Sequence, residues 1–119
     1  MPSDKARLAL FDIRANGKLA QDFVAGMTFD EFERDQRTFY AVMRALEIVS
    51  EAAGRLAPEV RARHPDLPWR KIIGVGSVYR HDYDNVAAQQ VWMTVRDYLP
   101  SLLSAIDHEI ARLDEAPSD

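Results

Sequence analysis

The feature that most constrains the fold is a helical repeat of apolar residues through most of the chain. It is strongest in two stretches: Phe39, Val42, Met43, Leu46, Val49, Ala53 and Leu56, and then Val91, Val95, Leu99, Leu102, Leu103, Ile106, Ile110 and Leu113. Spacings of three and four put such residues on one face of a helix, whereas a half-buried strand alternates apolar and polar residues. No alternating stretch is found in the 119 residues. The chain is therefore predicted to be all-α.

Local signals divide the N-terminal half into helices. Ser3 can cap a first helix, and Gly26 is a natural place for it to end. Spacings of three and four along this helix connect its apolar residues Leu8, Phe11, Ala15, Leu19 and Phe23. Thr28 and Glu31 have the spacing of a capping box for a second helix. Asp35 can cap a separate continuation that carries the first long apolar repeat.

Proline marks the boundaries in the C-terminal half. Pro58 suits the first turn of a short helix through Arg63, and Pro68 starts the next helix. The last long helix is predicted to be kinked at Pro100, because proline lacks the N–H of the helical ladder. Residues 115–119 are polar and are expected to form a frayed tail. The prediction is a single domain, residues 1–119, built as a bundle of four main helices plus short ones.

Composition excludes several kinds of site. The chain has no cysteine, which rules out disulfides, zinc–thiolate sites and thiol catalysis. Its three histidines, His64, His81 and His108, do not have metal-ligand spacing, so neither a metal nor another cofactor is expected. No apolar run approaches the roughly 20 residues of a membrane helix. A cytoplasmic location without membrane contact is the corresponding expectation.

Charge is distributed unevenly along the chain. The formal net charge is −4, which by itself argues against a nucleic-acid partner. Between Arg55 and Arg80, however, six basic residues face two acidic ones, so this segment is +4 and the remainder −8. The asymmetry is compatible with RNA binding and equally with a solvated helix face that carries several arginines.

The chemically richest segment lies inside this basic region. Arg80, His81 and Tyr83 place a cation, a group that titrates near neutral pH and a phenol within four positions. Histidine can take a proton from a ribose 2′-hydroxyl or give one to a leaving oxygen. A guanidinium can bind the phosphate and the charge that grows on it. The segment therefore suits phosphodiester chemistry, although an isolated histidine is more often a packed or surface residue.

Several blocks in order resemble one family. They are residues 26–32, residues 44–53 (similar to R-N-L-E-I-I-G-E-A-A), residues 68–74, residues 81–83 and residues 91–92. In these blocks the chain resembles the HepT-type toxins of the HEPN superfamily, ribonucleases that partner a minimal nucleotidyltransferase (MNT) antitoxin. The resemblance covers nearly the whole chain. It implies a HEPN-type helical bundle and a homodimer in which the two histidine segments meet in a shared cleft.

The family's catalytic pattern, Arg-Asn-x-x-x-His-x-Tyr, is matched only in part. His81 and Tyr83 occupy the His and Tyr positions, whereas Gly76 and Ser77 stand where the family has Arg and Asn. The resemblance implies that His81 is the general acid or base. It also implies that Tyr83 is a supporting group, which the antitoxin can adenylylate.

Helix geometry suggests how the arginine could be replaced. Gly76 and Arg80 are four residues apart and so lie on one helical face. The Arg80 side chain points back towards Gly76, where it could stabilise the phosphate in place of the missing arginine. Ser77, one turn before His81, could hydrogen-bond the histidine or the phosphate. The alternative is a surface arginine on a degenerate domain. The glycines Gly74 and Gly76 are predicted to allow close approach of another helix, a second subunit or a phosphate.

Other polar and aromatic residues carry weaker hypotheses. Arg70 and Lys71 are candidate RNA-binding residues at the start of the same helix. Trp69 and Trp92 could stack on bases, but their spacing beside apolar residues favours a place in the core or an interface.

A stripe of charged residues on the long central helix also has two interpretations. Arg44, Glu47 and Glu51 lie on one face of that helix. Ion pairing within the helix is the favoured interpretation. Support of the site around His81 is the less favoured one.

Three functions are therefore considered. The leading hypothesis is the toxin of a toxin–antitoxin system, a metal-independent endoribonuclease neutralised by a cognate nucleotidyltransferase. The second is a catalytically degenerate HEPN dimer that binds a nucleotidyltransferase and cuts nothing, which the substitutions at Gly76 and Ser77 favour. The third is an unrelated helical-bundle regulator.

Overall fold

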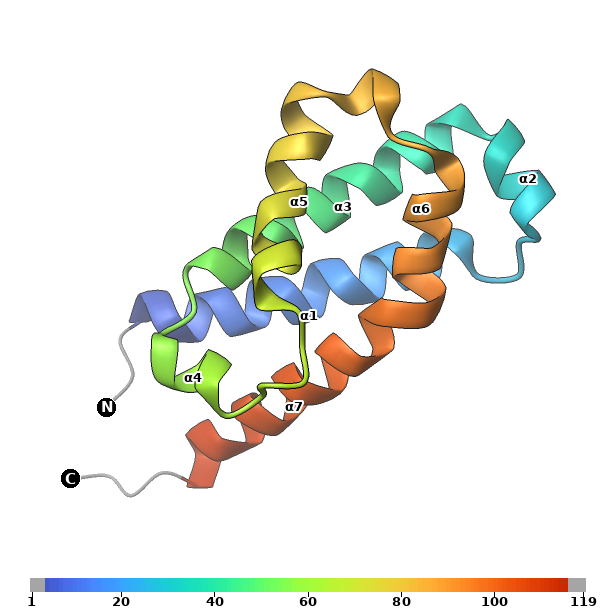
Figure 1. Ribbon diagram of the computed structural model, residues 1–119. Coiled ribbons are helices and arrows are strands. Elements are labelled where there is room, and N and C mark those ends of the chain that lie inside the picture. Colours follow the sequence, from blue (N-terminus) through green and yellow to red (C-terminus); the bar gives the residue numbers. More distant parts are fainter. Residues whose placement is uncertain (1–3, 116–119) are drawn as a thin grey trace.

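The computed structural model describes residues 4–115, which form helices and short connections (Figure 1). In chain order the elements are α1 (Asp4–Val24), α2 (Phe29–Arg34), α3 (Gln36–Gly54), α4 (Pro58–Ala62), α5 (Trp69–His81), the 3₁₀ turn η1 (Tyr83–Asn85), α6 (Ala88–Met93), the π-helical segment η2 (Thr94–Tyr98) and α7 (Leu99–Glu115). Segments α6, η2 and α7 follow one another without a break. With α1, α3 and α5 they make four main helices, as the sequence predicts.

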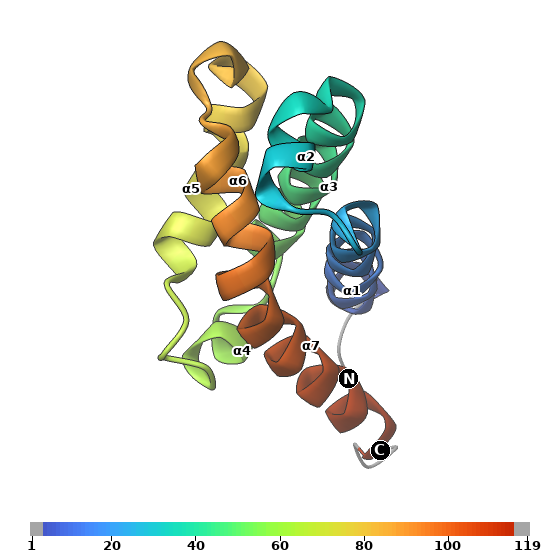
Figure 2. The same ribbon diagram turned by 90° about the vertical axis from the view of Figure 1, so that its right-hand side faces the viewer.

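The helix α3 lies between α1 and α5. It packs along α1 on one side and against α5 on the other, and α1 also contacts α7 (Figures 1 and 2). Figure 2, viewed from the end, shows α5 and α1 on opposite sides of α3. The site-bearing helix α5 therefore depends on α3 for its position.

The helix boundaries in the first half are those the local signals predicted. The Thr28 hydroxyl accepts a hydrogen bond from the Glu31 N–H (3.2 Å), and the Glu31 carboxylate accepts one from the Thr28 N–H (2.9 Å). Asp35 caps α3 by accepting from the Thr38 N–H at 3.0 Å. Gly26 has φ +77°, a conformation that glycine adopts without strain. The predicted Ser3 cap lies outside the described residues.

The apolar repeat that predicted α1 is mostly not the face that this helix buries, although Phe11 packs against the core. Its buried residues are Ala9, Leu10, Ile13, Gly17, Ala20 and Val24, whereas Leu8, Leu19 and Phe23 are 59%, 45% and 39% exposed. The buried residues and the exposed apolar residues of α1 both have helical spacing. Packing against other helices therefore decides which of the two sets is buried. At Gly17 a Cβ would lie 2.6 Å from Leu103 Cδ2, which shows how closely α7 approaches α1 there. Small residues permit that approach, and the bulkier stripe is left on the outside.

The irregularity in the last long helix lies before Pro100. The Leu99 N–H donates to the Thr94 carbonyl five residues back, which makes η2 a π-helical segment. Proline has no N–H and its ring crowds the carbonyl four residues earlier, here that of Arg96. The helix changes direction through this segment (Figure 1). Glu115, predicted to begin the frayed tail, is the last residue of α7, and 116–119 lie outside the described residues.

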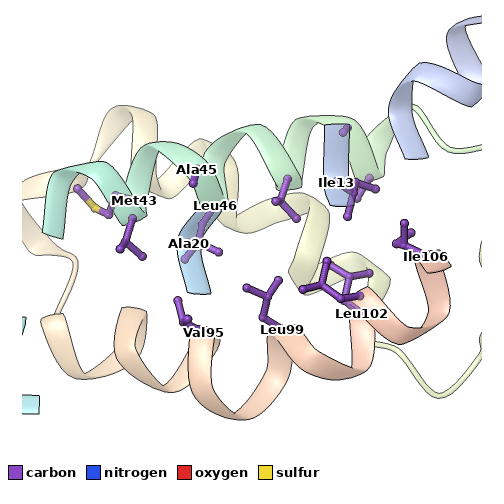
Figure 3. Close-up of a cluster of buried hydrophobic side chains, with 14 of the residues drawn as sticks. Ile13, Ala20, Met43, Ala45, Leu46, Val95, Leu99, Leu102 and Ile106 are labelled. Carbon is purple, nitrogen blue, oxygen red and sulfur yellow. The ribbon is translucent and has the colours of Figure 1, made fainter. Parts of the chain in front are cut away.

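The core joins all four main helices, because Tyr79 of α5 belongs to the same cluster as side chains of α1, α3 and the last helix. Figure 3 shows side chains of α1, α3 and the α6–α7 region meeting in one cluster, among them Ile13, Ala20, Met43, Leu46, Val95, Leu99, Leu102 and Ile106. The apolar repeats predicted for α3 and for the last helix supply most of this cluster. Within residues 4–115 no helix is long and apolar enough to cross a membrane.

Candidate active site

The candidate site lies at the C-terminal end of α5. His81 is the last residue of the helix, which ends as the Asp82 N–H bonds the Val78 carbonyl at 2.8 Å. The Asn85 amide donates to the Asp82 carboxylate at 2.7 Å and closes the turn that carries Tyr83. His81 and Tyr83 are both exposed, and the His81 ring forms no hydrogen bond with any described residue. Both side chains are therefore accessible to a ligand.

Arg80 is bound to two carboxylates of α3. Its Nε donates to Glu47 Oε2 at 3.1 Å, and its Nη2 pairs with Glu51 Oε1. The Arg80 side chain is 46% exposed, whereas that of Glu47 is only 13% exposed. Glu47 also pairs with Arg44 at 3.2 Å within α3. Both predicted roles of the charged stripe are thus present, because it forms an intrahelical ion pair and also contacts the candidate site.

These contacts fix the charge of Arg80 and leave donors free. The hydrogen bond to Glu47 raises the pKa of the Arg80 guanidinium, and the charge of Glu51 adds to the effect. A guanidinium has five N–H donors, of which these two hydrogen bonds use two. The remaining donors are available to a ligand, and a guanidinium binds phosphate well.

Gly76 lies where α5 crosses α3, and Ser50 fills the space beside it. The Gly76 N–H donates to Ser50 Oγ at 2.9 Å, and that hydroxyl donates to the Ile73 carbonyl at 2.7 Å. A Cβ on Gly76 would lie 2.5 Å from Ser50 Oγ. Close approach of another helix, one of the predicted roles, is therefore confirmed. The space beside Gly76, towards which Arg80 was predicted to point, is occupied by Ser50.

Ser77 lies on the exposed side of α5, one turn before His81. Its hydroxyl forms no hydrogen bond with His81 or any other described residue. The candidate role of Ser77 therefore stays a prediction that concerns a bound phosphate.

The structure also places next to the site residues that sequence reasoning missed. A cavity of about 350 Å³ is lined by Tyr40, Met43, Arg44, Glu47, Tyr79 and Tyr83. The Tyr40 ring meets the Tyr83 ring with centroids 6.3 Å apart. Tyr79 is buried, which raises the pKa of its phenol even though Thr94 hydrogen-bonds it. Tyr40 lies 43 positions from Tyr83, and no local motif connects the two.

Arg70 and Lys71 are exposed but lie at the other end of α5. Ten or eleven residues of helix separate them from His81, about 15 Å along the axis. One chain therefore does not bring them to the candidate site.

The two tryptophans pack against the core of the bundle, the interpretation that their spacing favoured. Trp69 Nε1 donates to the carbonyls of Arg61 (3.1 Å) and His64 (3.0 Å). Trp92 packs against the rings of Phe29 and Phe32 at centroid distances of 6.0 and 5.3 Å.

A second cluster of charged residues was also missed. Glu109, whose side chain is 2% exposed, accepts hydrogen bonds from Arg63 Nε (3.1 Å) and pairs with His64 Nε2 (2.7 Å). Burial favours the neutral acid, but the hydrogen bonds from Arg63 and His64 outweigh it and lower the pKa of Glu109. The cluster ties the segment after α4 to α7. Within residues 4–115 no group of three or more His, Asp and Glu side chains is arranged to bind a metal ion.

The fold and the site together define the class. The resemblance to HEPN-type proteins predicts an all-α bundle, and the structure shows one, with the His81–Tyr83 segment exposed at the end of α5. The family described as "Ribonuclease HepT-like" matches residues 13–109. The chain therefore belongs to the HepT-like ribonuclease family.

Individual relatives agree with this assignment. The chain is 32% identical over 114 residues to "Putative RNase MJ0127" of Methanocaldococcus jannaschii, which covers 96% of this chain and 94% of that protein. It is 34% identical over 93 residues to "Probable ribonuclease HepT" of Thermococcus cleftensis, covering 78% and 84%. No solved structure gives a significant match.

Proposed function

We propose that this protein is a metal-independent endoribonuclease that acts as the toxin of a toxin–antitoxin pair. The observation that carries the proposal is the exposed His81–Tyr83 segment beside Arg80 in a chain of the HepT-like ribonuclease family. Relatives that span nearly the whole chain are named as ribonucleases.

The proposed reaction is a transesterification within the RNA backbone, in which the phosphoryl group passes from the 5′-oxygen to the 2′-oxygen. The 2′-oxygen attacks the adjacent phosphorus as its proton passes to a base, and the bond from phosphorus to the 5′-oxygen breaks as that oxygen receives a proton. The products are a 2′,3′-cyclic phosphate and a 5′-hydroxyl. His81 acts as base or acid, and Arg80 binds the phosphate and the charge that grows on it.

A homodimer would supply the second proton-transfer group. In the arrangement that the family resemblance implies, the partner's His81 faces the same phosphate. Exposed apolar side chains on α5 and on the α6–η2 segment are available for such an interface. Val78, Met93 and Tyr98 are 46%, 38% and 60% exposed and line one cavity between α5 and the α6–η2 segment. Val78→Glu is expected to convert a dimer into a monomer, as measured by light scattering. It should also reduce cleavage of RNA by the purified protein.

The proposed partner is an MNT-type nucleotidyltransferase that adenylylates Tyr83. The phenol is 46% exposed and so open to modification. AMP on this oxygen would add an anion and a bulky group beside His81, which would repel the RNA phosphate and block its access. A cytoplasmic location fits such a pair.

Cleavage of RNA in EDTA tests the activity directly. Purified protein without its partner is incubated with total RNA and with tRNA, beside a folded His81→Ala variant. We expect cleavage by the natural protein alone. No cleavage by either, with Tyr83 shown by mass spectrometry to be unmodified, would refute the nuclease proposal.

A specific observation favours a second candidate, a catalytically inactive binding partner of a nucleotidyltransferase. Arg80 is paired with two carboxylates, and Ser50 occupies the space that an arginine at position 76 would need. This candidate predicts no cleavage, together with binding of the nucleotidyltransferase that survives His81→Ala.

A further inference from the structure

We propose that the cavity between α3 and the turn after α5 is a subsite for one RNA base beside the scissile phosphate, with guanine favoured over uracil. The subsite consists of Tyr40, Met43, Arg44, Glu47, Tyr79 and Tyr83. The inference rests on the proposed function, because it assigns a substrate contact of the same site. The volume of about 350 Å³ falls within the range of small-ligand pockets.

Two tyrosines give the cavity a surface for stacking. Tyr40 and Tyr83 are 50% and 46% exposed, and their rings meet at 63°. Rings set edge to face form a corner, in which a base can lie flat on one ring while the other covers its edge. Single-stranded RNA is commonly bound in this way, because every base has an aromatic face. The Tyr40 hydroxyl has no hydrogen-bond partner among residues 4–115, so it is not a structural anchor.

Arg44 and Glu47 supply donors and an acceptor on the wall beside these rings. The Arg44 side chain is 63% exposed and uses Nη1 to pair with Glu47 Oε2. The contact of Glu47 with Arg80 uses the same oxygen, so Oε1 takes no part in either pair. A guanidinium recognises paired acceptors such as guanine O6 and N7, and a carboxylate oxygen accepts from an exocyclic amine. Guanine presents both features, whereas uracil has no amino group.

Glu47 places this cavity next to the reacting phosphate. Its carboxylate contacts both Arg44, which lines the cavity, and Arg80, the proposed phosphate ligand. Tyr83 likewise belongs both to the cavity and to the His81 turn. A nucleotide whose phosphate lies at Arg80 therefore has its base, or that of its neighbour, within reach of the Tyr40 ring.

Binding of short single-stranded RNA to the His81→Ala protein tests the subsite without cleavage. Labelled oligonucleotides carry guanosine, uridine or an abasic residue at each position in turn, and affinity is read by fluorescence anisotropy. We expect one position where loss of guanine weakens binding. Adding Tyr40→Ala should weaken binding of the intact RNA roughly tenfold and remove that positional difference. Tyr40→Phe should retain both.

Phe23→Ala is the matched control, because Phe23 is an exposed aromatic residue of α1 that lines neither the subsite nor the proposed dimer surface. It should leave the positional preference unchanged, and thermal unfolding checks that each variant is folded. Equal affinity of the Tyr40→Ala and parent proteins for every oligonucleotide would overturn the proposal, as would the absence of any RNA binding.

Cleavage by proteins with His81 intact separates the two proposals. If the natural protein cuts RNA and Tyr40→Ala leaves both the rate and the choice of sites unchanged, the base subsite is refuted and the nuclease stands. If nothing is cut while binding still depends on Tyr40 at one RNA position, the nuclease is refuted and the subsite stands.

Discussion

Arg80 is held by two carboxylates and still has N–H donors for the phosphate-binding role proposed for it. Glu47 and Glu51 occupy one edge of its guanidinium and limit its rotation. The free donors lie on a half-exposed group next to His81. A guanidinium held in this way loses less conformational freedom when a phosphate binds.

If Arg80 has the proposed role, the Arg80→Ala substitution removes a donor to the transition state and is expected to lower kcat/KM for RNA by about 10² to 10³. Arg80→Lys should retain part of the activity. Single-turnover cleavage of an RNA substrate is the measurement. Arg55→Ala is the control, since Arg55 is likewise a half-exposed arginine paired with a carboxylate, Asp12. Full activity of Arg80→Ala would show that this arginine is not part of the site.

Two glycines on α5 have opposite surroundings. Gly76→Ala should lower the free energy of unfolding by about 1–3 kcal/mol, because the new methyl group would collide with Ser50. Gly74 has open space around its Cβ position. Gly74→Ala should therefore be neutral or stabilising by up to about 1 kcal/mol. Urea unfolding followed by circular dichroism measures both, and equal effects would contradict the crossing geometry.

At the scale of elements, the junction of α2 and α3 depends on one carboxylate. Asp35 accepts from the Thr38 N–H and hydroxyl, and these hydrogen bonds lower the pKa of Asp35. Asp35→Ala should lower the Tm, because the first turn of α3 loses its side-chain acceptor. Asp35→Asn, which can still accept the backbone bond, should recover most of this loss in thermal unfolding. An identical loss of thermal stability in both variants would show that capping of α3 by Asp35 does not stabilise the protein.

The sequence predicted the elements well where neighbouring residues decide the structure. The caps at Thr28 and Asp35 and the end at Gly26 involve residues within a few positions of each other. The apolar repeat of α1 did not indicate its buried face, because contacts with α3 and α7 select the stripe that includes Gly17. The π-helical segment before Pro100 was not predicted either. A proline indicates that the helical hydrogen bonding is interrupted, but it does not indicate whether a kink or a π-helical segment results.

The candidate site divides in the same way. His81 and Tyr83 could be found from their spacing within one turn. The partners of Arg80 could only be guessed, because Glu47 and Glu51 lie about thirty positions away on another helix. Tyr40 was missed for the same reason. Contacts between these distant residues depend on how α3 and α5 cross. A short sequence motif does not predict that crossing.

At the scale of the whole molecule, Glu109 links stability to pH. Its pKa is lower in the folded protein than the ordinary value of 4.5. The stabilisation by Arg63 and His64 is therefore complete above about pH 4.5 and is lost as the pH falls through the folded-state pKa. Glu109→Gln should destabilise the protein by about 1–2 kcal/mol at pH 7, a modest value because Arg63 is 38% exposed.

The pH profile of Tm distinguishes this ion cluster from simple packing. The difference in Tm between the natural protein and Glu109→Gln should shrink as the pH falls below about 4.5, because the natural glutamate then becomes neutral as well. Asp107→Asn, an exposed change on the same helix, should leave the profile unchanged. A constant difference at every pH would contradict the assigned role.

The contact of Ser50 with Gly76 also bears on how this site can change over generations. The family blocks that this chain resembles carry glycine where it has Ser50, and arginine where it has Gly76. An arginine arising first at position 76 would meet the serine hydroxyl at the helix crossing and would be selected against on stability alone. The substitution Ser50→Gly would have to come before the substitution of Gly76 by arginine. The order of mutations, and not only their sum, therefore decides whether a descendant of this protein can regain the family's arginine.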